Sequence, residues 1–338
     1  MRKQRLTYSD DSQDGFGRRR HGKGFIYPFP DGKPVRAPNV LKRIAALVIP
    51  PAWTEVWICP LPHGHIQATG RDAKGRKQYL YHADWQAFRN EQKFDRVLDF
   101  AQALPRLRRQ VETDLARHRL GRRKVTATVV RLLEWSLIRV GNPEYATQNG
   151  SFGLTTLTGK HVDVGSTRIL FEFTGKSGKE HQVEVRDARL ARIMRRCQEL
   201  PGQRLFRYRG RDGKVHAVSS TDVNDYIRKY CGPDFSAKDF RTWHATLLAA
   251  AVLSGTAKGE TEHATNRALA GAVKKVARQL GNTPAVCRSS YIHPRLIEDF
   301  SDGCLDLHFA APSDDEAQLD IVALSSLERK LVGYLQRA

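Results

Sequence analysis

Apolar residues recur at helical spacing towards the end of the chain and predict a helix over residues 261–280. Its buried face would consist of residues separated by four, three and four positions, Leu269, Val273, Val276 and Leu280. Gly281 is typical of the left-handed residue that follows a helix, and Pro284 indicates the stop. Tyr291 follows on a short connection before a further apolar segment opens at Pro294. A tyrosine is therefore expected just beyond a helix end.

The same periodicity predicts that most of the chain after residue 85 is helical. A helical pattern runs to about Arg139 with a break near Gly121. It returns later at 187–199, 221–231, 239–254, 294–301 and about 325–336. Three extended segments, with a glycine-bounded turn at 175–179, predict a small antiparallel sheet with an exposed tip over 160–164, 168–174 and 180–186.

Short strand-like runs dominate the chain from residue 24 to about residue 85. One helix interrupts them, which Asn39 is expected to cap and Pro50-Pro51 to end. A domain boundary is expected between residues 83 and 90. The fold class is therefore α+β, with a flexible basic arm over 1–22, a small β-rich domain over 23–86 and a mostly helical domain with a small antiparallel sheet over 87–338.

The net charge of the chain limits the classes of function that it can have. Its 56 Lys and Arg outnumber 36 Asp and Glu, which gives +20 spread along 338 residues. Such a balance favours the binding of a polyanion. Duplex DNA would be bound largely through its phosphates, with release of counterions. The hydrophobic content of 40% suffices for the cores of about two domains of ~150 residues each.

Cysteine usage and hydropathy bear on the compartment. Five cysteines without a Cys-x-x-Cys pair indicate neither a disulfide framework nor a zinc site. No apolar run approaches the ~20 residues of a membrane span, and no hydrophobic core follows the basic N-terminus. We expect a soluble protein of the cytoplasm with no membrane partner.

Several residues carry chemistry of one kind, although each alone is unremarkable. Arg139 stands near an expected helix end, Lys176 at the tip of the glycine-bounded hairpin, and Arg241 near the start of a helix, where an anion is favoured. Asn282 and Tyr291 follow near the end of the helix described above. Alternatives exist for each: a surface arginine, an ordinary turn lysine, a buried core tyrosine.

In this order, Arg139, Lys176, Arg241, Asn282 and Tyr291 resemble the active-site pattern of the type IB DNA topoisomerases. The resemblance extends along most of the chain, through the segments 70–79, 139–142, 153–157, 173–176, 239–242 and 281–284. The short length is similar to that of the poxviral and bacterial branch. The resemblance implies that the β-rich domain binds DNA, that the helical domain is catalytic, and that together they form a clamp around duplex DNA.

The resemblance also implies a mechanism. Tyr291 would attack the scissile phosphate to give a DNA 3′-phosphotyrosyl intermediate, whose religation relaxes positive and negative supercoils without ATP, metal or any cofactor. Arg139 and Arg241 would stabilise the developing charge, and Lys176 would protonate the departing 5′ oxygen. Asn282 stands where viral and nuclear relatives usually carry histidine; its amide can donate a hydrogen bond but cannot carry charge.

DNA-binding residues are expected in the β-rich domain by the same resemblance. They would face the major groove and the backbone, and they are Arg71, Lys77, Gln78, Tyr79 and Tyr81. A solvated basic strand is the alternative for each. The expected partner is double-stranded DNA, bound by a monomer associated with the nucleoid.

Two other functions compete. A tyrosine recombinase shares the Arg, Lys, Arg and Tyr chemistry, but its usual second-arginine motif is His-x-x-Arg, whereas residue 238, three before Arg241, is lysine. Its N-terminal domain would also be helical. A noncatalytic DNA-packaging protein would account for the charge alone and leave the five residues unexplained. The chain has no Gly-x-x-x-x-Gly-Lys-[Ser/Thr] nucleotide loop, and His63 and His65 lack a third metal ligand.

Overall fold

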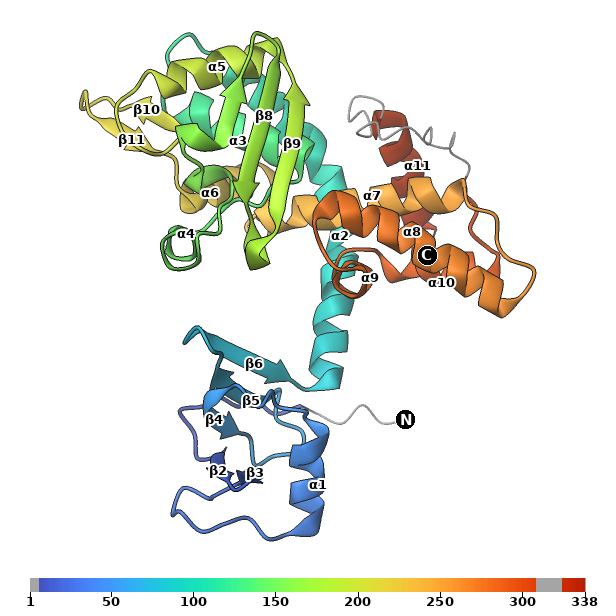
Figure 1. The fold of residues 1–338 in the computed structure, drawn as a ribbon. Coiled ribbons are helices and arrows are strands. Elements are labelled where there is room, and N and C mark those ends of the chain that lie inside the picture. Colours follow the sequence, from blue (N-terminus) through green and yellow to red (C-terminus); the bar gives the residue numbers. More distant parts are fainter. Residues whose placement is uncertain (1–5, 308–323, 338) are drawn as a thin grey trace. The chain divides into compact units, whose positions relative to one another are not determined.

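The computed structural model describes residues 6–307 and 324–337. The chain divides into two compact units, residues 1–93 and 94–338, each with its own hydrophobic core. The boundary falls inside one long helix, α2 (Ala83–Leu115). The β-rich first unit and the mostly helical second unit confirm the α+β fold class (Figure 1).

The first unit is built on an antiparallel sheet of four strands. Their order is β1 (Phe16–Gly17), β4 (Thr54–Ile58), β5 (Ile66–Arg71) and β6 (Lys77–Tyr81). A separate hairpin joins β2 (Arg19–His21) to β3 (Gly24–Ile26), and a short helix, α1, spans Pro38–Ala46. Apolar side chains from the sheet, from α1 and from the loop before α1 form the core, namely Phe16, Val35, Ile44, Val56, Ile58 and Ala68.

Two details of this unit differ from the sequence prediction. Residues expected in a flexible arm contribute strands, since Phe16 pairs with Ile58 of β4. Asn39 does not cap α1: the helix begins at Pro38, and the cap position is Ala37, which makes no side-chain bond. Proline is suited to the first helical position, because its fixed φ matches the helix and its missing N–H would have no helical partner there.

The second unit combines helices with a small sheet. The sheet is antiparallel, in the order β7 (Val162–Val164), β8 (Arg168–Thr174) and β9 (Glu180–Arg186). Figure 1 shows it with α3 (Arg122–Ser136) and α5 (Ala188–Gln198) behind it, and both helices contact its strands. A two-stranded ribbon, β10 (Arg207–Arg209) and β11 (Val215–Ala217), precedes α6 (Ser220–Cys231).

Helix α7 (Ala237–Ser254) is the buried centre of the remaining helices. It packs against α3, α8 (Glu262–Leu280), α10 (Pro294–Asp302) and α11 (Leu324–Gln336). Two short helices, α4 (Pro143–Asn149) and α9 (Pro284–Ser290), begin at prolines, and three single turns complete the unit: η1 (Leu154–Thr156), η2 (Gly159–His161) and η3 (Lys176–Gly178). Within the described ranges, no helix is both long and apolar enough to cross a bilayer.

Two helix ends near the predicted site differ from the sequence prediction. Helix α3 stops at Ser136, after which Leu137 adopts a left-handed conformation (φ 55°), so Arg139 lies in the connection that follows the helix rather than at its terminus. Gly281 caps α8 as expected, with φ 64°. Pro284 opens α9, and Tyr291 is the residue that ends it. The sequence predicts only a stop at Pro284, whereas the structure uses this proline in a first helical turn, to which its fixed φ is equally suited.

Candidate active site

Arg139 is held by a close backbone approach between its own segment and η1. Its carbonyl accepts the N–H of Leu154 at 2.9 Å, and the carbonyl of Val140 accepts that of Thr155 at 2.8 Å. A Cβ on Gly153 would lie 2.5 Å from the Arg139 carbonyl oxygen, so only glycine allows this approach. The backbone that presents Arg139 is therefore fixed from both sides.

Asn282 lies in the turn that ends α8. The N–H of Asn282 bonds the carbonyl of Ala277 at 3.0 Å and that of Gly281 bonds Arg278 at 3.1 Å, which is a Schellman motif. The side chain is thereby directed at Arg139, whose Nη2 donates to Asn282 Oδ1 at 2.6 Å. Two residues 143 positions apart in the sequence thus share one hydrogen bond.

Arg241 joins the two segments just described. It is 6% exposed and sits in the second turn of α7, a helix that begins with a capping box between Ser236 and Asp239. One terminal nitrogen donates to the carbonyl of Leu137 after α3, and the other donates to the carbonyl of Leu280 at the end of α8, at 2.6 Å. Arg241 therefore lies near the start of its helix, as the sequence predicted, and two carbonyls at the ends of other helices orient its side chain.

Tyr291 faces this guanidinium. The Cζ of Arg241 lies 5.5 Å from the centroid of the tyrosine ring. The backbone of Tyr291 is held by Thr246 of α7, whose buried hydroxyl contacts the Tyr291 carbonyl at 3.2 Å and accepts the N–H of His293 at 3.2 Å. One helix, α7, thus anchors both Arg241 and the tyrosine segment.

The electrostatics of the cluster suit an anion. Burial lowers the pKa of Arg139, and burial together with the charge of Arg139 lowers the pKa of Arg241 to about 10. Both guanidinium groups therefore remain charged at neutral pH. Two further donors, Arg241 Nε and Asn282 Nδ2, are buried without a hydrogen-bond partner within the described residues. Buried donors are normally paired. These two therefore mark a place where the oxygen of a ligand would accept hydrogen bonds from the protein.

Lys176 is not part of this cluster in the structure. It is exposed on η3, at the tip of the β8–β9 hairpin. No hydrogen bond, ion pair or ring contact among the described residues joins it to Arg139, Arg241, Asn282 or Tyr291. The same turn does reach the segment that carries Asn282, because Lys179 Nζ donates to the carbonyl of Gly281 at 3.4 Å.

Comparison with known proteins decides the family. Residues 82–308 match the family described as "Eukaryotic DNA topoisomerase I, catalytic core", and residues 24–72 match "Bacterial DNA topoisomerase IB, N-terminal domain". The DNA topoisomerase 1B of Acanthamoeba polyphaga mimivirus is 32% identical over 327 residues, covering 95% of this chain and 97% of the relative. The chain belongs to the type IB DNA topoisomerase family.

More distant viral relatives cover less of the chain. The DNA topoisomerase 1B of Vaccinia virus (strain Copenhagen) is 21% identical over 238 residues, 69% of this chain and 72% of the relative. The DNA topoisomerase 1 of Rabbit fibroma virus (strain Kasza) is 24% identical over 242 residues, 68% and 70% respectively. This membership decides against the recombinase and the packaging protein; the Arg, Lys, Arg and Tyr chemistry alone would not separate a type IB enzyme from a recombinase.

The DNA-facing residues expected in the first unit of this type IB topoisomerase do not all share a face. In β6, Lys77, Tyr79 and Tyr81 are exposed, and the two tyrosine rings stack with centroids 6.0 Å apart. Arg71 pairs directly opposite Lys77, so its side chain lies on the same face of the sheet. Gln78 points to the other face, where its amide donates to Asp72 at 3.0 Å.

Two of these basic residues already have acidic partners. Lys77 forms an ion pair with Asp11 at 2.6 Å, and Arg71 forms one with Glu55 at 2.8 Å. Both pairs are partly solvent-exposed, and exposed pairs of this kind contribute little to stability. Arg71 and Lys77 can therefore leave their carboxylate partners and bind DNA phosphate at a small cost in free energy.

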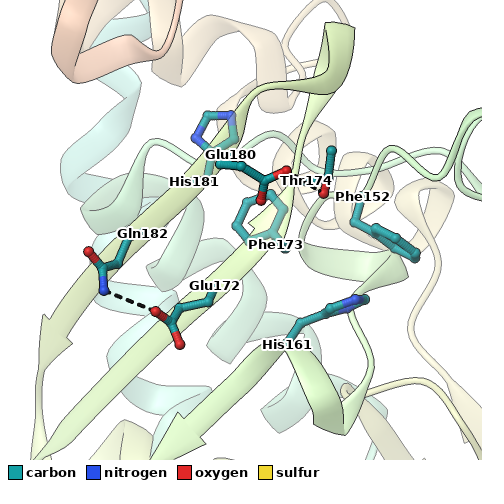
Figure 2. Close-up of a pocket in the computed structure, with 8 residues that line it drawn as sticks. All are labelled: Phe152, His161, Glu172, Phe173, Thr174, Glu180, His181 and Gln182. Carbon is teal, nitrogen blue, oxygen red and sulfur yellow. Dashed lines mark hydrogen bonds between the residues drawn. The ribbon is translucent and has the colours of Figure 1, made fainter.

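A pocket of about 520 Å³ lies on the sheet of the second unit, beside the hairpin (Figure 2). It is lined by aromatic, imidazole, carboxylate, hydroxyl and amide groups, Phe152, His161, Glu172, Phe173, Thr174, Glu180, His181 and Gln182. Two hydrogen bonds cross between the strands, from Gln182 to Glu172 at 2.9 Å and from Thr174 to Glu180 at 2.8 Å. None of the five predicted catalytic side chains lines this pocket.

Sequence reasoning missed two residues that support the site, Thr246 and His181. Thr246 follows Arg241 by five positions, and a threonine inside a helix carries no signal of a tertiary role. His181 is the second residue of the returning strand, β9. Its position five residues after Lys176 is visible in the sequence, but its contact with α8 is not.

Proposed function

We propose that Tyr291 is the nucleophile with which this type IB topoisomerase cleaves one strand of duplex DNA. The tyrosine oxygen forms a bond to the scissile phosphorus, the bond from phosphorus to the 5′ oxygen breaks, and a 3′-phosphotyrosyl end and a 5′-hydroxyl result. The tyrosine loses its proton and the departing oxygen gains one. Religation is the reverse exchange, and strand rotation between the two steps relaxes supercoils of either sign.

One observation carries the assignment: Arg139, Arg241 and Asn282 gather beside Tyr291, and two buried donors there have no partner among the described residues. An in-line transfer spreads negative charge over the nonbridging phosphate oxygens. Two permanently charged guanidinium groups and an amide N–H supply donors for these oxygens. Removal of one such donor typically costs about 10²- to 10³-fold in rate.

Lys176 is proposed as the general acid that protonates the 5′ oxygen. Its place in a hairpin turn that also contacts the turn of Asn282, through Lys179, supports this role. An exposed ammonium on a four-carbon stem can extend towards a bound strand. A positioned acid contributes about 10²- to 10⁴-fold.

The exchange needs no energy source, because the phosphotyrosyl bond retains the energy of the phosphodiester it replaces. The substrate is proposed to be double-stranded DNA, bound by a monomer at the nucleoid. The exposed face formed by Arg71, Lys77, Tyr79 and Tyr81 supports contacts to backbone and bases from the first unit. Gln78 keeps the proposed role only if it exchanges its bond with Asp72 for a base edge.

Plasmid relaxation tests the activity, and a single-atom change tests the nucleophile. Supercoiled plasmid incubated with the pure protein in EDTA, without nucleotide, should yield relaxed topoisomers. Tyr291→Phe should abolish relaxation and the covalent DNA adduct on denaturing gels while leaving duplex binding unchanged, because one oxygen is lost and the basic surface is kept. A covalent adduct formed by Tyr291→Phe would show that another residue is the nucleophile.

A further inference from the structure

The imidazole of His181 lies between two glycines that belong to opposite sides of the active site. A Cβ on Gly175 would lie 2.5 Å from Cδ2 and Nε2 of the ring, and a Cβ on Gly281 would lie 2.6 Å from Cε1. The ring therefore touches the backbone of both residues where a side chain would otherwise stand. Gly175 immediately precedes Lys176, and Gly281 immediately precedes Asn282.

Other contacts hold the ring in this place. It stacks on Phe173, a buried residue of β8, with centroids 5.1 Å apart and planes inclined by 10°. Phe173 and His181 are both drawn in Figure 2, on neighbouring strands at one end of the pocket. Beside the ring, Lys179 bonds the carbonyl of Gly281. The imidazole is thus packed against the sheet on one side and against the end of α8 on the other.

We propose that His181 is a positioning residue that sets the Lys176 hairpin in register with the turn carrying Asn282. This inference rests on the proposed role of Lys176 as general acid. The ring fills the gap between the two glycines and so fixes the distance between the backbone that carries the acid and the backbone that carries a donor to the phosphate. Misplacement of a reacting group by about 1 Å can cost on the order of 10²-fold in rate.

The charge state of His181 is consistent with packing as its role. Burial, followed by the charges of Arg139 and Arg241, lowers the pKa of the imidazole, so it is neutral at neutral pH. A neutral ring adds no third cation beside the two arginines. Its contribution is therefore shape, acting through Lys176 and not on the DNA directly.

A substrate that needs no acid separates this role from a general structural one. In an oligonucleotide with a 5′-bridging phosphorothiolate, the departing group is a thiolate, which leaves without a proton. We expect His181→Ala to cleave ordinary duplex about 10²-fold more slowly than the unmodified enzyme in single turnover. On the phosphorothiolate, the same variant should cleave within about threefold of the unmodified enzyme, because a general acid no longer contributes.

Two further variants keep the experiment decisive. Gly175→Ala places a methyl group against the same ring without backbone strain, since φ is −95° there. This variant should also cleave ordinary duplex slowly and the phosphorothiolate at a nearly normal rate, even if His181→Ala folds poorly. His161→Ala removes a histidine that lines the same pocket but contacts Phe152 instead, with ring planes inclined by 52°. It should cleave both substrates at the normal rate.

The outcomes separate the inference from the proposed function. Equal slowing of His181→Ala on both substrates, or no slowing on either, overturns the positioning role. Lys176→Ala is measured in parallel: rescue of Lys176→Ala without rescue of His181→Ala refutes only the inference. Failure of the phosphorothiolate to rescue Lys176→Ala refutes the acid assignment and, with it, the role proposed for His181.

Discussion

At the scale of single residues, one guanidinium joins two helix ends and is also proposed to take part in the chemistry. Arg241 uses its two terminal nitrogens to bond the carbonyls of Leu137 and Leu280, which end two helices. Its third nitrogen, Nε, has no hydrogen-bond partner among the residues that the structure describes. A lysine at this position could not satisfy two carbonyls and still offer a third fixed donor, because its ammonium is a compact group on a flexible stem.

Asn282 permits a prediction about charge. Asn282→Ala should slow single-turnover cleavage less than Arg139→Ala or Arg241→Ala, because a neutral hydrogen bond is worth about 1 kcal/mol and a charge-assisted one about twice that. Asn282→His should remain active and become faster at mildly acid pH, where the imidazole is protonated. Cleavage rates between pH 5 and 9 would test this.

The pH range in which Asn282→His should cleave faster follows from the neighbours of residue 282. Arg139 donates to this side chain, and the charges of Arg139 and Arg241 already lower the pKa of His181 nearby. An introduced imidazole would be lowered in the same direction, so the rate should rise only below its ordinary pKa of about 6.5. An inactive Asn282→His would mean that the site requires the amide.

At the scale of elements, α7 fixes the relative positions of two parts of the candidate site, because it carries one and anchors the other. Arg241 lies in its second turn, and Thr246 lies five residues further along. The Thr246 hydroxyl contacts the carbonyls of Thr242 and Tyr291 and accepts the N–H of His293. A shift of α7 would therefore move an arginine and the tyrosine backbone together.

Thr246 tests this coupling. Thr246→Val has nearly the same shape but no hydroxyl, and it should cleave DNA about tenfold more slowly, because the N–H of His293 loses its acceptor beside Tyr291. Thr246→Ser keeps the hydroxyl and should cleave within about threefold of the unmodified enzyme. Duplex affinity should stay unchanged in both. Similar rates for the valine and serine variants would assign Thr246 to packing alone.

The sheet of the first unit supports a prediction about DNA affinity. Asp11 pairs with Lys77 on the face of β6 that is proposed to meet DNA. Asp11→Asn removes a negative charge and releases the lysine, so binding should tighten about two- to fivefold and the salt dependence should steepen by about one phosphate contact. Fluorescence anisotropy at several salt concentrations would measure both.

Asp31→Asn is the matched control for this experiment. Its partner is Lys33, and the pair lies in the loop after β3, away from β6. The control removes the same charge, so it corrects for the change in net charge. Equal tightening in both variants would show that the position of Asp11 on the sheet is irrelevant.

At the scale of the whole molecule, stability should depend on the protonation of His293. The imidazole contacts Phe94 of α2, and its Nδ1 accepts the N–H of Arg295 at the start of α10. Burial, then the charge of Arg295, lowers its pKa to about 4 from 6.5. The unfolded chain therefore binds the proton more readily, and the contribution to stability is present above pH 6.5 and lost as pH falls towards 4.

His293→Asn should flatten this part of the stability profile. Asparagine retains a cap acceptor for α10 but does not titrate. The free energy of unfolding of the unmodified protein should fall more steeply between pH 6.5 and 4 than that of the variant. The two should differ by about 1.4 kcal/mol for each unit of pKa shift, and unfolding midpoints measured across this pH range would show it. Parallel profiles would contradict the prediction.

Much of the architecture could be predicted from local patterns. The helix 261–280 and its Gly281 cap appear as expected, because an apolar face at helical spacing and a residue free to adopt positive φ are local requirements. The hairpin around residues 175–179 and the break at Gly121 follow for similar reasons. Local reasoning erred at Asn39, which does not cap α1, and at Pro284, which opens a helix as well as following one.

The sequence by itself determined the class of fold and the basic character, and its resemblance along most of the chain indicated the family that the comparisons show. Only the tertiary structure decided how these residues meet: that Arg139 bonds Asn282, that Arg241 holds two helix ends, and that Lys176 stands apart from them. It also revealed Thr246 and His181. The physical reason is that helix caps and turns depend on neighbours in the chain, whereas these contacts join segments that approach only when the core around α7 has packed.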